Sequence, residues 1–141
     1  MMLQIHHRES RDVDIFLSDP QLLSFLDPQT HDFEFKIQPV EYIGDGARFL
    51  RLAFDKIGEV DFFVEHGLTS SPFTQIIIDG EVVLLETIPE IVTKKIYYRA
   101  SSIKPRDIFD IAAAEDQHTN LLIKELKKIS RRSNANARND R

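Results

Sequence analysis

The chain has 141 residues, a length that suits one domain with a single hydrophobic core and is short for two. Its composition, 42% hydrophobic and 29% charged, is ordinary for a globular protein and argues against disorder over most of the length. The net charge of −5 excludes a global positive field that would attract nucleic acid, and the count of zero cysteines excludes disulfides and cysteine-held zinc.

The sequence carries no signal for a membrane or for export. No apolar run approaches the length needed to cross a bilayer, and residues 1–8 are too short and too polar for a signal peptide. The lack of cysteine fits a reducing compartment. We therefore expect a cytoplasmic protein without a membrane partner.

The first part of the chain alternates short strand and helix patterns. Asp19 precedes Pro20 and then apolar residues at helical spacing, which is typical of a helix start. The patterns predict the tail of a helix, a strand, a short helix and a loosely alternating strand, in that order, at residues 1–7, 12–17, 20–26 and 33–43.

The second part begins with strands and ends with helices. Two strand patterns cover 48–54 and 60–64, and Asp79-Gly80 between apolar runs is a strong hairpin signal that joins strands at 73–78 and 81–85. Thr87 and Pro89 are typical of a helix start, a second helix is expected near Pro105, and a third is marked by apolar residues at helical spacing, Leu121, Leu122, Leu126 and Ile129.

This order predicts an α+β (α/β) domain with a mixed sheet. We expect a sheet core at residues 1–85 and a helical C-terminal part of the same domain at 86–129. Residues 130–141 contain no apolar side chain larger than Ala, and for that reason we expect them to be a disordered tail.

Asp12 and Asp14 are the most informative pair of residues in the chain. On a strand their carboxylates point to one face, while Val13 and Ile15 point to the other. Two adjacent carboxylates repel unless a cation lies between them, and oxygen ligands of this kind suit Mg²⁺. An isolated Asp-x-Asp pair is nevertheless more often a solvated surface feature.

Asp61 is the third candidate acid. It lies in an apolar strand pattern, where Val60 and Phe62 face one side and Asp61 and Phe63 face the other. A charge inside such a run is costly unless it meets a cation or lies at a strand end, and an edge strand that faces water is the alternative. Together with Asp12 and Asp14, Asp61 would complete an oxygen cage for a divalent metal.

Lys95 lies on the apolar stripe of the helix expected after Pro89, whereas Lys94 lies off the stripe and is expected to be solvated. The alternative for Lys95 is that its stem covers apolar surface while its amine stays in water. An anionic phosphate or a carboxylate would explain its position better.

A cluster of charges surrounds the expected helix start at Pro105. Asp107 and Asp110 are three residues apart and would share one helix face, and the helix dipole alone would favour Asp107 there. Basic residues crowd the preceding segment, namely Arg99, Lys104 and Arg106. The phosphates of a nucleotide are the natural ligand for such a basic segment on an acidic protein.

Four motifs in this order resemble the AbiEii/AbiGii family of nucleotidyltransferase toxins. They are His-Arg-x-Ser-x-Asp-x-Asp-x-Phe from His7, Val-Asp-Phe-Phe from Val60, Glu-Ile-x-x-Lys-Lys-x-x-x-Arg from Glu90 and Arg-Asp-x-x-Asp from Arg106. The resemblance runs from His7 to Ala114. It implies a DNA polymerase β-like nucleotidyltransferase fold, with a mixed sheet and flanking helices, and the enzymatic role in a type IV toxin–antitoxin or abortive-infection system.

The resemblance also implies roles for individual residues. Asp12 and Asp14 correspond to the metal-binding pair, Asp61 to the third acid, and Asp107 to an acid implicated in activity. Nucleotide-binding positions correspond to Arg8, Ser10, Lys95, Arg99, Arg106 and Asp110. The implied cofactor is Mg²⁺, and the implied partners are an NTP, a hydroxyl acceptor such as tRNA or another RNA, and a cognate antitoxin.

One motif of the family does not occur here. The Gly-Ser turn and helix that precede the His-Arg segment in the family, and hold the triphosphate, are missing, so we expect an N-terminally truncated relative or a true start upstream. Two further functions stay open. One is a catalytically impaired relative that binds a nucleotide or a protein partner, and the other is a structural α+β domain whose acids are merely exposed.

Overall fold

The computed structural model describes residues 1–6, 9–31, 34–99 and 102–139 and has a mixed α+β fold. It divides into two compact units. The sheet unit is Glu9–His66, and the helical unit combines Met1–Arg8 with Gly67–Arg141. Each unit is described by itself below.

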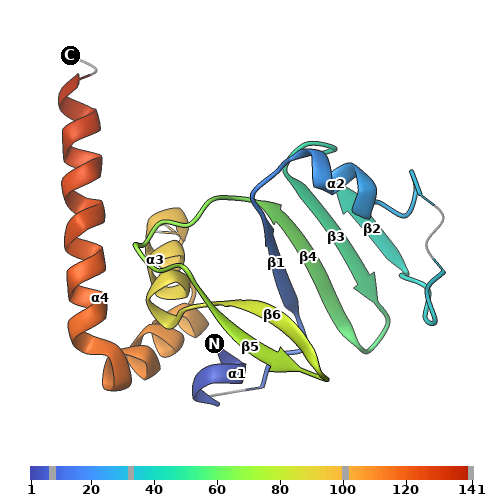
Figure 1. The fold of residues 1–141 in the computed structure, drawn as a ribbon, viewed down its shortest axis with the longest axis horizontal. Helices are drawn as coiled ribbons and strands as arrows, with labels where there is room; N and C mark the ends of the chain where they lie inside the picture. Colours follow the sequence, from blue (N-terminus) through green and yellow to red (C-terminus); the bar gives the residue numbers. More distant parts are fainter. Residues whose placement is uncertain (7–8, 32–33, 100–101, 140–141) are drawn as a thin grey trace. The chain divides into compact units, whose positions relative to one another are not determined.

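The sheet unit is built on a four-stranded mixed sheet with the strand order β1-β4-β3-β2 (Figure 1). β1 (Val13–Leu17) pairs in parallel with β4 (Gly58–Val64), whereas β3 (Phe49–Phe54) pairs antiparallel with both β4 and β2 (Glu41–Gly44). The short helix α2 (Gln21–Leu26) follows β1. The mixed sheet predicted from the sequence is therefore confirmed.

One face of this sheet carries the hydrophobic core of the unit. Leu50, Leu52 and Phe62 point to that face and pack with Leu23 of α2, and all four side chains are buried. Because side chains alternate along a strand, the residues between them point to the opposite face. Asp14 and Asp61, two of the acids singled out in the sequence, project to that opposite face.

The helical unit contains the predicted hairpin, β5 (Phe73–Ile78) and β6 (Glu81–Glu86). Asp79 and Gly80 both have positive φ, 51° and 87°, as the tight turn between two paired strands requires. α1 (Met2–Ile5) joins this unit, since Gln4 donates a side-chain hydrogen bond to the carbonyl of Glu86.

Two helices complete the helical unit, α3 (Ile88–Arg99) and α4 (Pro105–Asn139). Their shared core consists of buried Ile88 and Val92 from α3 with Ala114 and Leu122 from α4. α4 bends at His118, where φ is −134° and ψ is 18°, so it is two helices joined at a kink, as the sequence pattern predicts (Figure 1). Helical backbone continues to Asn139, beyond residue 129 where we expected the helical part to end.

The strand expected at 33–43 is the main difference from the sequence pattern. Phe33 lies outside the described residues, residues 34–40 are not in a strand, and only Glu41–Gly44 pairs with β3. Phe35 instead packs against the core cluster from a loop. Of the apolar residues in this stretch only Phe35 packs against the core, whereas Ile37 and Val40 are exposed, so the alternating pattern does not mark a strand with a buried face here.

Gly58 allows the chain before β1 to approach β4 closely. Its φ is +146°, and a Cβ placed on it would lie 2.3 Å from the carbonyl oxygen of Arg11. Gly58→Ala should therefore lower the free energy of unfolding of the sheet unit by about 2–4 kcal/mol, because backbone atoms must move. Gly46→Ala, at φ +71° with open space around it, is the matched control and should cost about 1 kcal/mol.

Urea unfolding followed by the amide signals of β3 and β4 measures both variants. An equal cost for Gly58→Ala and Gly46→Ala would show that the close approach to Arg11 does not constrain the unit.

Candidate functional site

The parallel pairing of β1 with β4 brings two of the predicted acids together. Asp14 is the direct register partner of Asp61. Paired residues on neighbouring strands project to the same face, about 5 Å apart, so both carboxylates lie on the face opposite Leu23. We call this surface the acidic face; from the strand register and alternation it carries Asp12, Asp14, Glu59, Asp61 and Arg51.

Arg51 forms the dominant interaction of the acidic face. It is the register partner of Asp61 across β3 and β4, and its guanidinium donates Nε to Oδ1 at 2.7 Å and Nη2 to Oδ2 at 2.5 Å. Nη1 lies 3.2 Å from Oε2 of Glu59. The hydrogen bond with Asp61 is the main cause that raises the pKa of Arg51, so the guanidinium stays charged. Asp61, only 6% exposed, is thus a buried carboxylate with a bidentate partner.

Asp12 lies one residue before β1, and its carboxylate is hydrogen-bonded to the backbone of β4. The amide of Glu59 donates to Oδ1 of Asp12 at 3.3 Å. Beside it an open hollow of about 320 Å³ is lined in part by Arg11, Lys56, Asp12 and Glu59. The hollow therefore places two cationic residues next to one end of the acidic face.

The acidic face has the donor atoms that Mg²⁺ prefers, since Asp12, Asp14 and Asp61 offer only oxygen. In the parts of the chain that the structure describes, no group of three or more His, Cys, Asp and Glu side chains is already arranged to hold a metal ion. The carboxylate of Asp61 is turned to Arg51 instead. The residue types and the shared face fit a divalent cation, and Arg51 takes the place of its positive charge.

Lys95 and the Arg-Asp-x-x-Asp motif form a second charged cluster, in the helical unit. Lys95 Nζ lies 2.8 Å from Oδ1 of Asp107 and 3.0 Å from Oδ2 of Asp110, so the two aspartates share one face of α4 as predicted. Arg99 donates to Oδ1 of Asp107 at 2.7 Å. Two buried aspartates, a lysine and an arginine thus join α3 to α4 with no net charge.

Asp107 also caps the first turn of α4 in the manner of a capping box. Its Oδ2 accepts a hydrogen bond from the backbone amide of Lys104 at 3.1 Å, three residues back. Burial acts to raise the pKa of Asp107, but the bonds from Lys95, Lys104 and Arg99 outweigh it and lower that pKa to about 2. Asp107 is therefore ionised, and it holds its cationic partners firmly.

The other predicted nucleotide-binding residues have varied surroundings. Arg106 is exposed at the start of α4, and Arg99 is 39% exposed while it contacts Asp107. The Ser10 hydroxyl lies 3.5 Å from the carbonyl oxygen of Asp12. Arg8 lies outside the described residues.

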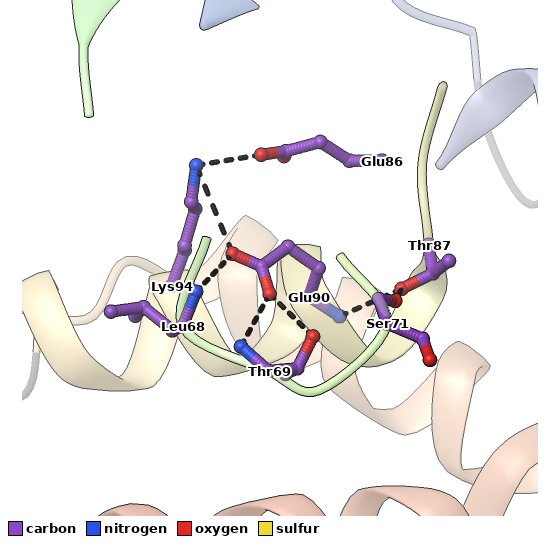
Figure 2. Close-up of polar contacts among 7 residues, drawn as sticks. All are labelled: Leu68, Thr69, Ser71, Glu86, Thr87, Glu90 and Lys94. Carbon is purple, nitrogen blue, oxygen red and sulfur yellow. Dashed lines mark hydrogen bonds and ion pairs between the residues drawn. The ribbon is translucent and has the colours of Figure 1, made fainter. Parts of the chain in front are cut away.

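The expectation that Lys94 is solvated is wrong. Lys94 is buried. Its Nζ lies 2.6 Å from Oε1 of Glu86 and 3.9 Å from Oε1 of Glu90 (Figure 2). The helix has a second buried side because the hairpin and the loop before it pack there. A pattern of apolar residues does not reveal a helix side that is buried through ion pairs.

Glu90 holds that loop in place. Its carboxylate is fully buried and accepts hydrogen bonds from the amides of Leu68 and Thr69, both at 2.8 Å, and from the Thr69 hydroxyl at 2.6 Å (Figure 2). Glu125 of α4 accepts from the Ser70 hydroxyl at 3.0 Å. Two carboxylates therefore fix the first residues of the helical unit after Gly67.

Sequence reasoning missed Arg51, Glu59 and Glu90. Glu59 and Asp61 are two residues apart, like Asp12 and Asp14, so the shared face could have been found from spacing alone. Arg51 could not, because only the β3–β4 register places it opposite Asp61. Glu90 has an ordinary position in the first turn of a helix, and only the tertiary structure shows the loop it binds.

Comparisons of the chain with protein-family models, with curated proteins and with solved structures gave no match. Among the described residues, no helix is long and apolar enough to span a membrane.

The lowered pKa of Asp107 predicts acid lability of the helical unit. A carboxylate whose pKa falls from 3.8 unfolded to about 2 folded contributes stability that is complete above pH 4 and is lost as the pH falls toward 2. The expected contribution at pH 7 is about 2 kcal/mol. Thermal unfolding of wild type and of Asp107→Asn across this range measures it.

The stability difference between the two proteins should be largest above pH 4 and shrink toward pH 2. A difference that is independent of pH would mean that Asp107 acts through packing and not through its charge.

Proposed function

We propose that the chain is a Mg²⁺-dependent nucleotidyltransferase, with a nucleotidyltransferase-like sheet unit, that transfers a nucleotidyl group from an NTP to a hydroxyl acceptor such as tRNA or another RNA. The proposed setting is the toxin of a type IV toxin–antitoxin or abortive-infection system, with an antitoxin as its partner. The observation that carries the proposal is the register pairing of Asp14 with Asp61, because it puts acids from two motifs distant in sequence on one face.

The carboxylates of the acidic face are positioned to serve as ligands of a metal ion. Asp12 and Asp14 are held on the same side by strand alternation, and Asp12 is further held by the amide of Glu59. These two residues, with Asp61, would hold Mg²⁺. The chemistry that bound Mg²⁺ supplies at such a site is neutralisation of phosphate charge and activation of an acceptor oxygen.

The cationic residues near Asp12 have a separate role in the proposal. Arg11 and Lys56 line the open hollow with Asp12 and Glu59, and a polyphosphate needs such cations close to its metal-binding acids. The hollow would receive the phosphates. Asp61, once it is released by Arg51, would either complete the Mg²⁺ site or accept the proton of the acceptor hydroxyl.

The resemblance assigns nucleotide binding in the helical unit to Lys95, Arg99, Arg106 and Asp110, with Asp107 as a further acid implicated in activity. The exposed Arg106 and the partly exposed Arg99 are the residues whose charge is accessible to a phosphate. Lys95 and the two aspartates are engaged with one another, and their contribution would be to position Arg99.

A second candidate is a catalytically impaired relative that binds a nucleotide or a protein partner. The bidentate ion pair of Arg51 with Asp61 favours it, because a carboxylate neutralised in this way neither binds a cation nor accepts a proton. Measurement of nucleotide transfer and of cation binding on the same protein separates the two candidates. The enzyme shows both properties, whereas the binding module shows no nucleotide transfer, with or without cation binding.

Incubation with total RNA and each labelled NTP tests the enzymatic function. Asp14→Asn and Asp12→Asn should each lower label transfer at least about a hundredfold, because carboxylate ligands are lost at almost unchanged size. Asp55→Asn is the matched control, an exposed aspartate in the turn between β3 and β4, and should retain full transfer. Undiminished labelling by Asp14→Asn would end the proposed metal role.

A further inference from the structure

We propose that Arg51 is an internal competitor for the divalent cation, which keeps Asp61 from it until the cation displaces the guanidinium. The inference rests on the proposed function of the acidic face and adds a regulatory residue to it. It concerns a residue that neither the motifs nor the resemblance assigns. The contacts of Arg51 with three neighbours on the same face carry the argument.

The first step is that Arg51 uses both oxygens of Asp61. The bonds from Nε at 2.7 Å and from Nη2 at 2.5 Å occupy Oδ1 and Oδ2, and they do so in the bidentate geometry that matches a planar guanidinium to a carboxylate. A cation that binds Asp61 through both oxygens must displace the guanidinium, and a cation that uses the remaining lone pair of one oxygen must bind beside the positive charge of Arg51. Cation binding and the ion pair therefore oppose each other.

The second step is that Arg51 can leave Asp61 without leaving the face. Its Nη1 already contacts Glu59 at 3.2 Å, and its guanidinium carbon lies 5.6 Å from the centre of the Phe49 ring. Glu59 and Phe49 both project to the acidic face, because each is two residues along a strand from a member of the Arg51–Asp61 pair. These contacts retain the positive charge near the site after Asp61 is released.

The third step is that the competition works through charge as well as through occupancy. A guanidinium within bonding distance of Asp61 opposes any second cation there, and a charge at this distance changes an affinity by about tenfold or more. Removal of Arg51 should therefore tighten cation binding although it removes a stabilising ion pair. An arginine remote from the cation would lower stability on removal without tightening cation binding.

Titration of the full chain with Mn²⁺, followed by the magnetic resonance signal of the free ion, tests the inference. Arg51→Gln should bind Mn²⁺ about tenfold or more tightly than wild type, and Arg51→Lys should lie between them because an ammonium is a point charge. Arg48→Gln is the matched control. It removes the same charge three residues earlier, at an exposed position just before β3, and should shift affinity less than about twofold.

Thermal unfolding of the same proteins supplies a second readout. Without a divalent cation, Arg51→Gln should melt below wild type, since Asp61 loses its partner. On addition of Mn²⁺ the rise in melting temperature should be larger for Arg51→Gln than for wild type. Equal affinity in Arg51→Gln and wild type, weaker affinity in the variant, or no binding by either protein would overturn the inference.

A further test uses the wild-type protein, so it does not require that any variant folds. The Nε–H signal of Arg51 should be protected from exchange with water in the cation-free protein and lose that protection as Mg²⁺ is added. A signal that Mg²⁺ leaves protected would overturn the inference. Loss of RNA labelling in Asp14→Asn without a change of Mn²⁺ affinity in Arg51→Gln would refute the role of Arg51 and support the enzymatic function. Tighter Mn²⁺ binding by Arg51→Gln with undiminished RNA labelling by Asp14→Asn would support the role of Arg51 and refute the enzymatic function.

Discussion

The parallel pairing of β1 with β4 is the constraint on which the rest of the sheet unit depends. Its register sets Asp14 beside Asp61, and the antiparallel register of β3 then sets Arg51 beside Asp61 on the other side. One row across three strands therefore reads carboxylate, carboxylate, guanidinium. A slip of one residue in either pairing would send one member of this row to the core face, where an uncompensated charge is costly.

The ion pairs that compensate buried charges differ between the two units. In the helical unit, Lys95 and Arg99 balance Asp107 and Asp110, and Lys94 pairs with Glu86 near Glu90. In the sheet unit a single guanidinium, that of Arg51, contacts both Asp61 and Glu59, while Asp12 and Asp14 lie on the same face. One positive charge is therefore shared by two carboxylates there.

The two charged clusters that contain the motifs shared with nucleotidyltransferase toxins therefore have different roles. The third and fourth motifs supply the cluster of the helical unit, in which Lys95 and Arg99 balance Asp107 and Asp110 and join α3 to α4. The acidic face gathers Asp12, Asp14, Glu59 and Asp61 around Arg51, and an open hollow lined in part by Arg11 and Lys56 lies beside Asp12. We therefore place the proposed activity in the sheet unit, where Arg51 would set the affinity of the acidic face for a cation.

The sequence by itself determined the local elements and the faces of strands, because side-chain alternation and turn chemistry are local. It predicted β1, the hairpin turn at Asp79-Gly80 and the division of the last helices, and it placed Asp12 with Asp14 and Asp107 with Asp110. Only the tertiary structure decided that Asp61 meets Arg51, that Lys94 is buried and that Glu90 binds the loop after Gly67. These contacts join residues that no local periodicity relates, since they depend on strand register and on the packing of a helix against a loop.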